Sequence, residues 1–269
     1  MTDKLYRYAE RKKAASASAE IVRRGNTFLS RGDGRLYCII GLLFTATVFM
    51  GGYYLCFTCL FFFCPILTQT GPAIITYADF IGFAAGNVCA LCPLLGLRYA
   101  VCEGEKNGRI DLRNMFTVYS FGSYSGRFAL PFLLSFFRTA GVWAILAGWI
   151  FHGHYIPVGP FLRTVGCVFM NLLWLFATRI PALYSWLRIY GADGPGRHVL
   201  RSYSLRTTGR TVRKVFNRLA LKWLLCVPTV FIHTVICSIP AGLASKAVLC
   251  RFLTDTRECD NNYPERKTQ

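Results

Sequence analysis

The distribution of charge along the chain is the sequence feature that most constrains its fold. Long stretches carry almost no charged residue, whereas the short stretches between them carry many. Residues 36–67 contain no charge, and residues 73–97 are interrupted only by Asp79 and Asn87. A helix needs ~20 apolar residues to cross a hydrocarbon core ~30 Å thick. Both stretches are long enough, so they predict membrane-spanning helices and an all-α, polytopic transmembrane helical bundle.

Further spans are expected beyond residue 115. The apolar residues 115–151 are too many for one simple span, and Pro131 and Arg138 divide them. This favours an interfacial or partly buried helix before the arginine and a span over 139–155. One long helix kinked at Pro131 is the alternative. A fourth span is expected over 161–187, with Arg179 near its inner end.

The last third of the chain predicts a fifth span over 219–241, bent or ended by Pro228 and Pro240. A short helix over 243–253 follows, and a sixth pass there would reverse the side of the C-terminus. The chain thus divides into a basic N-terminal tail over 1–35, a transmembrane helical domain over 36–253 and a polar C-terminal tail over 254–269. We expect the last of these to be disordered.

Three polar segments separate or precede the apolar ones. Residues 6–21 predict a short polar helix that Gly25 and Gly32 would end. Residues 98–113 predict a polar loop, and residues 188–218 predict the most basic loop of the chain.

The positions of the basic residues predict the orientation of the chain. Cytoplasmic segments of membrane proteins are enriched in Lys and Arg. Nine basic residues lie in the N-terminal tail, five in residues 98–127 and eight in residues 188–218, against one in residues 152–163. This bias predicts a cytoplasmic N-terminus in a multi-pass protein of the cell membrane.

The positive net charge of the chain is also explained by basic cytoplasmic segments. There are 31 Lys and Arg against 13 Asp and Glu, which gives +18. In a soluble protein this balance would suggest nucleic acid as the partner. Because basic cytoplasmic loops account for the excess, we expect no nucleic-acid binding. The expected partners are anionic headgroups of the inner leaflet and, as a further candidate, another membrane protein.

Two expected spans carry stripes of small residues, which allow helices to approach closely. One stripe follows Asp79 at helical spacing and places that side chain on a packed face. It consists of Gly82, Gly86 and Ala90. The other is expected to be a packing seam of the third span. It consists of Ala140, Ala144 and Gly148.

Asp79 is the only acidic side chain inside an expected span. Ionisable groups at such positions face the bundle interior, a cavity or a partner. One hypothesis is an ion or proton path lined by Asp79 and Asn87. The favoured alternative is a structural tie of Asp79 to Arg138, to a hydroxyl such as that of Thr76, or to interfacial water.

Two Cys-x-x-Cys pairs raise the question of a metal site. Cys56 and Cys59 should lie near the outer end of the first span, whereas Cys89 and Cys92 should lie in the inner half of the second. One zinc ion cannot bridge such different depths. We therefore expect cysteines that act as small apolar residues. A disulfide involving Cys64 is the alternative.

No other motif predicts catalysis or a cofactor. His152 and His154 flank a glycine, but no Asp, Glu or Cys near them completes a metal site. The chain has no nucleophile elbow, phosphate-binding glycine motif, metalloprotease helix motif or pair of acidic residues in a span. The sequence therefore leans away from an enzyme and predicts no metal and no cofactor.

The last basic segment predicts a helix that lies on the inner leaflet. A helix from about Thr207 would gather cations on one side and Val212, Phe216 and Leu219 on the other. Such a helix suits a membrane surface with anionic headgroups. The simpler alternative is that these cations only keep the segment on the cytoplasmic side and recognise no specific lipid. The candidate lipid or partner contacts are Arg206, Arg210, Arg213, Lys214 and Arg218.

Several short motifs also point to a family. A Leu-Gly pair at 95–96 ends an expected span, Gly-Glu at 104–105 lies in the next turn, and Asp-Leu at 111–112 with Met-Phe at 115–116 opens the following helix. This order resembles uncharacterised bacterial multi-pass membrane proteins related to the membrane domain of glycerophosphoryl diester phosphodiesterases. Residues 199–223, with Ser202 or Ser204 near their start, are similar to that family's basic helix before a final span.

The resemblance covers about half of the chain. The family's Pro-Gly at the end of the middle span is replaced here by Ile-Pro-Val-Gly at 156–159. The resemblance implies a helical fold and a bacterial membrane. It implies no catalytic residues, because the family has no established activity and this chain has no catalytic phosphodiesterase domain.

The leading hypothesis from the sequence is a non-enzymatic structural or accessory component of the bacterial cytoplasmic membrane. A small transporter or permease-like subunit with a polar path near Asp79 is second, and a membrane enzyme is third.

Overall fold

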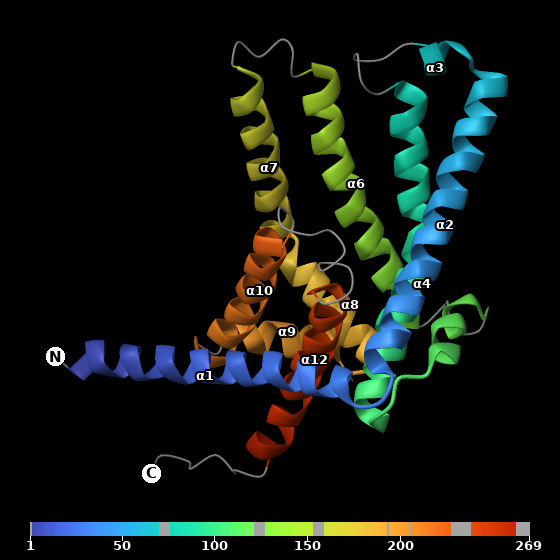
Figure 1. Cartoon of the computed structure of the whole chain (residues 1–269). Helices are drawn as coiled ribbons and strands as arrows, with labels where there is room; N and C mark the ends of the chain where they lie inside the picture. The colour runs from blue at the N-terminus through green and yellow to red at the C-terminus, as the bar shows by residue number, and fades with distance from the viewer. Residues whose placement is uncertain are drawn as a thin grey trace. The chain divides into compact units, whose positions relative to one another are not determined.

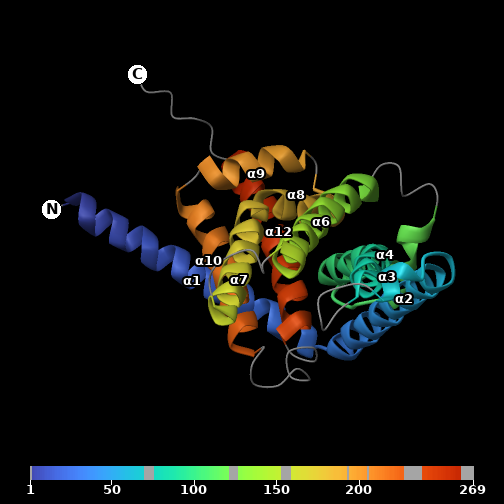
Figure 2. The ribbon, with the colours of Figure 1, turned by 90° about the horizontal axis from the view of Figure 1, so that it is seen from above.

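The computed structural model of the chain is built of helices (Figures 1 and 2), and none of its described residues forms a β-strand. It describes residues 2–69, 76–120, 127–152, 159–192, 194–204, 206–226 and 238–261. The helices are α1 (Thr2–Ser30), α2 (Gly34–Phe63), α3 (Ile66–Gln69), α4 (Tyr77–Asn107), the 3-10 helix η1 (Leu112–Tyr119), α6 (Ala129–His152), α7 (Pro160–Ala177), α8 (Arg179–Tyr190), α9 (Pro195–Ser204), α10 (Arg206–Cys226) and α12 (Ile239–Asn261). The predicted all-α class is confirmed.

The chain forms two compact units. Unit 1 consists of Met1–Ile40, Leu97–Met115 and Trp186–Gln269, and unit 2 consists of Gly41–Gly96 and Phe116–Ser185. Charge divides sharply between them. Unit 2 contains only five charged residues, namely Asp79, Arg127, Arg138, Arg163 and Arg179.

Unit 1 has a buried apolar core. Its α1 packs along α12 and α10 (Figures 1 and 2). The side chains of Val101, Val212 and Leu249 are almost completely buried in this unit. The segment predicted as a tail therefore contains a long helix with tertiary contacts.

Helix α1 does not end at Gly25, where the sequence predicted its end. A Cβ atom on Gly25 would lie 2.8 Å from the Ser245 backbone nitrogen of α12. The glycine is thus used for a close helix crossing and not as a stop signal. Helix α1 ends at Ser30, and Gly32 follows with a φ of 59°, a left-handed conformation that favours glycine.

In unit 2, α2 and α4 form a closely packed antiparallel pair. A Cβ atom on Gly86 would lie 2.6 Å from the Phe49 carbonyl oxygen, and one on Gly82 would lie 2.9 Å from the Tyr53 ring. Both glycines are buried. The predicted packing role of this small-residue stripe is confirmed.

The second pair in unit 2 is α6 with α7. A Cβ atom on Gly141 would overlap the Trp174 ring, and one on Gly166 would lie 2.7 Å from the Trp149 ring. The small residues predicted as a seam lie elsewhere: Gly148 has no neighbouring atom within 4 Å, and Ala140 and Ala144 are exposed. That prediction is wrong, because aromatic rings packed on glycines, and not the small-residue stripe, join α6 to α7.

Unit 2 exposes its apolar surface. Among the described residues, 27 of the exposed large hydrophobic side chains belong to unit 2 and 3 belong to unit 1. Helices α2, α4 and α6 are each long and apolar enough to cross a membrane, and α7 with α8 form a fourth span if the pair is counted as one. The described ranges therefore contain three or four spans, fewer than the five predicted. Of the predicted fifth span over 219–241, the central residues 227–237 lie outside the described residues.

Two predicted boundaries are wrong for local reasons. Helix α4 continues through the expected polar loop to Asn107, helped by a Glu103–Lys106 ion pair of 3.0 Å, and Gly108 ends it with a φ of 76°. Helix α6 runs uninterrupted through Arg138. Its Pro131 lies in the first turn, where the missing N–H group has no partner within the helix.

The rest of the chain also differs from the expected loops. The fourth span is bent by 49° between α7 and α8. Pro181 explains the break, because it has no N–H group to bond the Ala177 carbonyl. The basic loop over 188–218 contains α9 and most of α10. Helix α12 extends through Asn261 into the expected disordered tail, and residues 262–269 lie outside the described residues.

Candidate functional site

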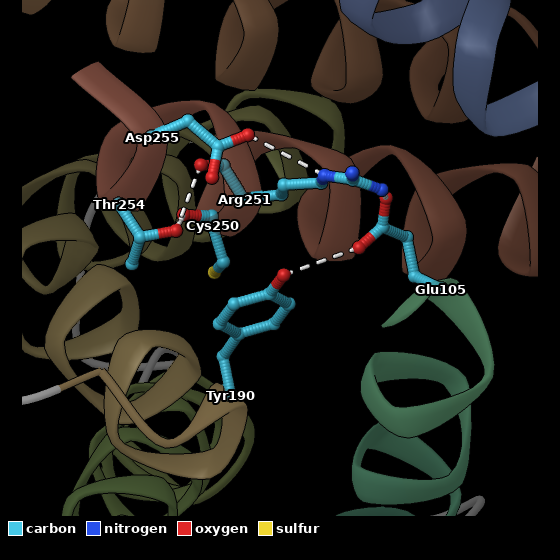
Figure 3. A network of polar contacts seen from close by, with 6 residues as sticks. All are labelled: Glu105, Tyr190, Cys250, Arg251, Thr254 and Asp255. Carbon is cyan, nitrogen blue, oxygen red and sulfur yellow. Dashed lines mark hydrogen bonds and ion pairs between the residues drawn. The ribbon is translucent and has the colours of Figure 1, made fainter. Parts of the chain in front are cut away.

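A network of polar side chains ties three helices of unit 1 together (Figure 3). At its centre is Glu105, near the end of α4, whose side chain is only 8% exposed. Arg251 of α12 donates a hydrogen bond of 3.1 Å from Nη1 to Glu105 Oε1. The hydroxyl of Tyr190, at the end of α8, donates one of 3.2 Å to Oε2. Both carboxylate oxygens are therefore engaged.

The α12 side of this network extends along one helix face. Arg251 also contacts Asp255, at 3.4 Å, and the Thr254 hydroxyl bonds the carbonyl of Cys250 (Figure 3). The hydrogen bond and charge of Glu105 raise the pKa of Arg251. Burial raises the pKa of the Cys250 thiol well above its ordinary value. A neutral buried thiol is a poor nucleophile, so Cys250 packs as a small apolar side chain.

Aromatic rings near this network carry cations. The Lys106 Nζ lies 4.5 Å from the centre of the Tyr190 ring. Arg98 and Lys246 each lie 5.6 Å from the centre of the Trp186 ring. These cation–π contacts join α4, α8 and α12 again, so unit 1 holds part of its positive charge against buried aromatic rings.

Asp79 forms a capping box at the start of α4. The Thr76 hydroxyl donates to Asp79 Oδ2 at 2.7 Å and accepts from the Asp79 backbone N–H at 3.0 Å, and the Thr76 N–H also donates to Oδ2. This reciprocal pattern satisfies N–H groups that a helix start leaves unpaired. The Tyr53 hydroxyl of α2 donates to Asp79 Oδ1 at 2.7 Å. The spacing Thr-x-x-Asp is a known sequence signal for this cap. The sequence analysis named Thr76 as a partner of Asp79 but did not predict the cap.

Asn87 and Arg138 do not join Asp79. The Asn87 amide donates to the Phe83 carbonyl of its own helix at 2.8 Å. The Arg138 carbonyl accepts a hydrogen bond of 2.9 Å from the Trp174 indole of α7. Among the residues that the structure describes, the buried Arg138 Nε has no hydrogen-bond partner. The three polar residues predicted inside spans are thus separate features.

The basic helix is present as α10, with its polar and apolar sides as predicted. Val212 and Leu219 are buried, while Arg213 and Arg218 are exposed. Since α1 packs on α10, the apolar side belongs to the core of unit 1, whereas a membrane surface was expected to cover it. Of the remaining candidates, Arg210 and Lys214 are half-buried, and the Arg206 side chain lies outside the described residues.

The cysteines differ in one respect from the prediction. A Cβ atom on Gly52 would lie 2.9 Å from Cys89 Sγ, so Cys89 lies about one turn from Cys56 in depth. Cys56, Cys59, Cys89, Cys92 and Cys64 are free thiols. Within the described ranges no three His, Cys, Asp or Glu side chains are grouped to hold a metal ion. The His152 side chain and residues 153–158 lie outside those ranges.

The tie between Glu105, Tyr190 and Arg251 was not predicted. Glu105 and Arg251 are 146 residues apart, and no local pattern marks them as partners. Comparison with protein-family models, curated proteins and solved structures finds no match. The resemblance to a bacterial membrane-protein family therefore stays a prediction.

Proposed function

We propose that this chain is a non-enzymatic, multi-pass component of the cell membrane. It acts through helix packing and through a cationic surface that engages anionic lipid or a membrane-protein partner. The observation that carries the proposal is the contrast between the units: the described part of unit 2 exposes 27 large hydrophobic side chains, and unit 1 contains nearly all the charge.

The apolar surface of unit 2 favours lipid as its solvent. Fully burying a large apolar side chain contributes roughly 1.5–3 kcal/mol. If the 27 exposed side chains of the described part of unit 2 faced water, the total free-energy cost would be far larger than the stabilisation from any single polar contact. Helix α6 illustrates this, since only 11% of its most apolar stretch is buried within the chain.

The hydrogen bonds of Asp79 favour a structural role over the transporter alternative. Both carboxylate oxygens accept hydrogen bonds from Tyr53 and Thr76, and Asn87 bonds only its own helix. A transport path needs polar groups that converge and exchange their partners. Asp79 therefore serves as a helix cap that joins α2 to α4.

The exposed cations of α10 support the lipid-facing part of the proposal. Each basic residue near an anionic surface contributes about 1 kcal/mol. Arg213 and Arg218 point away from the core, while the apolar residues of the same helix hold it on unit 1. Packing on unit 1 thus holds α10 in place while Arg213 and Arg218 remain exposed. The proposed attraction between these cations and anionic lipid is electrostatic.

Charge reversal on α10 tests this role. In polymer-excised native membrane discs, the wild-type chain should be enriched in anionic phospholipid relative to the bulk membrane. The variant R213E/R218E should lose most of this enrichment, because two attractions of about 1 kcal/mol each become repulsions. Quantifying the lipids that co-purify measures the effect.

The matched control is R213K/R218K, which keeps both charges and should keep the enrichment. About 1 M salt should reduce the wild-type enrichment, since the Debye length falls to ~3 Å. Equal enrichment in the charge-reversed and wild-type chains would rule out the role assigned to α10.

A further inference from the structure

Helix α2 is longer than an ordinary bilayer core requires. Its charge-free part, residues 36–63, is ~42 Å long, against a hydrocarbon core of ~30 Å. Other candidate spans fit that core better. The charge-free part of α4 over 80–97 is ~27 Å long, and the span of α6, Ala129–Phe151, is ~34 Å long. Helix α2 therefore exceeds the core by about 10 Å.

The excess length lies at the C-terminal end of α2. A Cβ atom on Gly82 would lie 2.9 Å from the Tyr53 ring, so these two residues of the antiparallel helices are level with each other. Asp79 precedes Gly82 by three residues and is therefore level with about residue 56 of α2. Helix α2 continues to Phe63, which is ~10 Å beyond that level.

This end of the α2 hairpin, residues 57–66, is called the α2 tip below. It contains no charged residue. Phe61, Phe62 and Phe63 are 53%, 73% and 85% exposed, and Ile66 is 69% exposed. The three aromatic rings alone expose roughly 400 Å² of apolar surface. The tip thus continues, without a break in polarity, the apolar surface that unit 2 presents along the rest of α2.

Tilting of the helix cannot absorb the excess length. A segment of ~42 Å fits a core of ~30 Å only at a tilt of ~45°, whereas spans tilt by ~20° on average and by up to ~40°. Helix α4 packs closely on α2 and would tilt with it. Its charge-free part would then cover only ~19 Å, which would draw Asp79 or Arg98 into the core. Local thickening of the bilayer avoids this conflict at a modest cost per Å.

The hydrogen bonds of Asp79 allow acyl chains to reach the tip. If hydrocarbon covers Phe63, the Asp79 carboxylate lies ~10 Å below that level. Ionisable groups at such a depth need partners supplied by the protein. Tyr53 and Thr76 each donate a hydrogen bond of 2.7 Å to Asp79, one to each oxygen. Asp79 therefore tolerates hydrocarbon around it, whereas the phenylalanine rings of the tip have no such compensation in water.

We propose that phospholipid acyl chains cover the α2 tip, so that the bilayer is locally thicker beside α2 and lipids with long acyl chains are enriched there. This inference rests on the proposed membrane location and deepens it by naming the class of lipid. It is independent of the cations of α10, because acyl-chain length and headgroup charge are separate properties of a lipid.

Three native cysteines report the depth of the tip. Cys59, Cys64 and Cys89 are free thiols on the surface of the chain. With one full-length chain per nanodisc of dioleoylphosphatidylcholine, a charged, water-soluble maleimide is added, and mass spectrometry of peptides gives the labelling rate of each thiol. Cys59 should react at least about tenfold more slowly than Cys64, because the reacting thiolate does not form in hydrocarbon. Cys89, nearer the middle of α4, should also be protected, and all three should react in sodium dodecyl sulfate.

Two matched variants test whether the phenylalanines hold the lipid at this level. In F61S/F62S/F63S the hydrocarbon can withdraw toward Asp79, so Cys59 should react within about twofold of Cys64. L43S/M50S/L55S carries the same number of apolar-to-serine changes on exposed positions nearer the middle of α2 and should keep Cys59 protected. Far-ultraviolet circular dichroism checks that both variants are helical.

The lipids that the chain selects provide the second measurement. The chain is reconstituted in an equimolar mixture of dimyristoleoyl-, dioleoyl- and dierucoylphosphatidylcholine, which differ only in acyl-chain length, and is excised with a polymer. Wild type and L43S/M50S/L55S should enrich the longest lipid over the shortest by at least about twofold, since it reduces the mismatch at α2. F61S/F62S/F63S should lose this enrichment.

The inference is overturned if Cys59 reacts as fast as Cys64 in wild-type nanodiscs, or if wild type and F61S/F62S/F63S select the same lipids. Protection of Cys59 only in nanodiscs that hold two chains would also overturn it, since a second copy would then cover the tip. A helical, monodisperse chain in nanodiscs that gives any of these results contradicts the role of the tip and leaves the proposed membrane location intact.

Discussion

Replacing Glu105 with alanine should destabilise unit 1 by about 2–4 kcal/mol, because it removes the centre of a nearly buried polar network. The Glu105 side chain is 8% exposed and joins α4 to α8 and α12 through Tyr190 and Arg251. Loss of the carboxylate removes a charge-assisted hydrogen bond and leaves the Tyr190 hydroxyl without this acceptor. Hydrogen exchange of the α12 amides in detergent measures the change as a free energy of local opening.

The neighbouring acid provides the control for this prediction. Glu103 pairs with Lys106 at 3.0 Å, but both side chains are more exposed, at 19% and 33%. Glu103→Ala should therefore change the opening free energy by less than about 1 kcal/mol. Similar exchange rates in the two variants would mean that the Glu105 network does not hold α12 in place.

Replacing Gly25 with alanine should also destabilise unit 1, by about 1–3 kcal/mol. The new Cβ atom would lie 2.8–2.9 Å from backbone atoms of Ser245, so α1 and α12 would have to separate. Overpacking of this kind costs about 1–3 kcal/mol. It should outweigh the gain of up to ~1 kcal/mol that alanine brings to a helix interior.

Gly242 is the matched control, since it lies on α12 and a Cβ atom added to it would have no neighbouring atom within 4 Å. Gly242→Ala should leave stability unchanged or raise it by up to ~1 kcal/mol. The two glycine variants should thus shift the thermal unfolding temperature of the purified chain in opposite directions. A shift of the same sign in both would contradict the close crossing of α1 and α12.

Sequence patterns predicted the features that depend on composition or on spacing within one helix. The charge-free run over 36–67 predicted α2, and the glycines at 82 and 86 predicted a packed face of α4, which α2 covers. The two sides of α10 also followed from the spacing of its cations. These features were accessible because the residues concerned are neighbours on one helix.

Features that depend on tertiary contacts were not predicted. Gly25 has the composition of a helix stop, and only its contact with Ser245 shows that it is a crossing point. The charge of Arg138 suggested a boundary, yet the helix continues because its backbone hydrogen bonds are independent of that charge. Similarly, the apolar side of α10 could not be assigned to lipid or to protein before α1 was placed. The cap formed by Thr76 and Asp79 could have been predicted, because the Thr-x-x-Asp spacing is visible in the sequence.

The central claim is that lipid solvates the apolar surface of unit 2. Analytical ultracentrifugation of the purified full chain after detergent removal tests it most directly. We expect a helical, monodisperse species when the chain is transferred to lipid nanodiscs and aggregation when it is transferred to plain buffer, because 27 exposed large hydrophobic side chains would face water. A folded, dispersed polypeptide in plain buffer would contradict the claim.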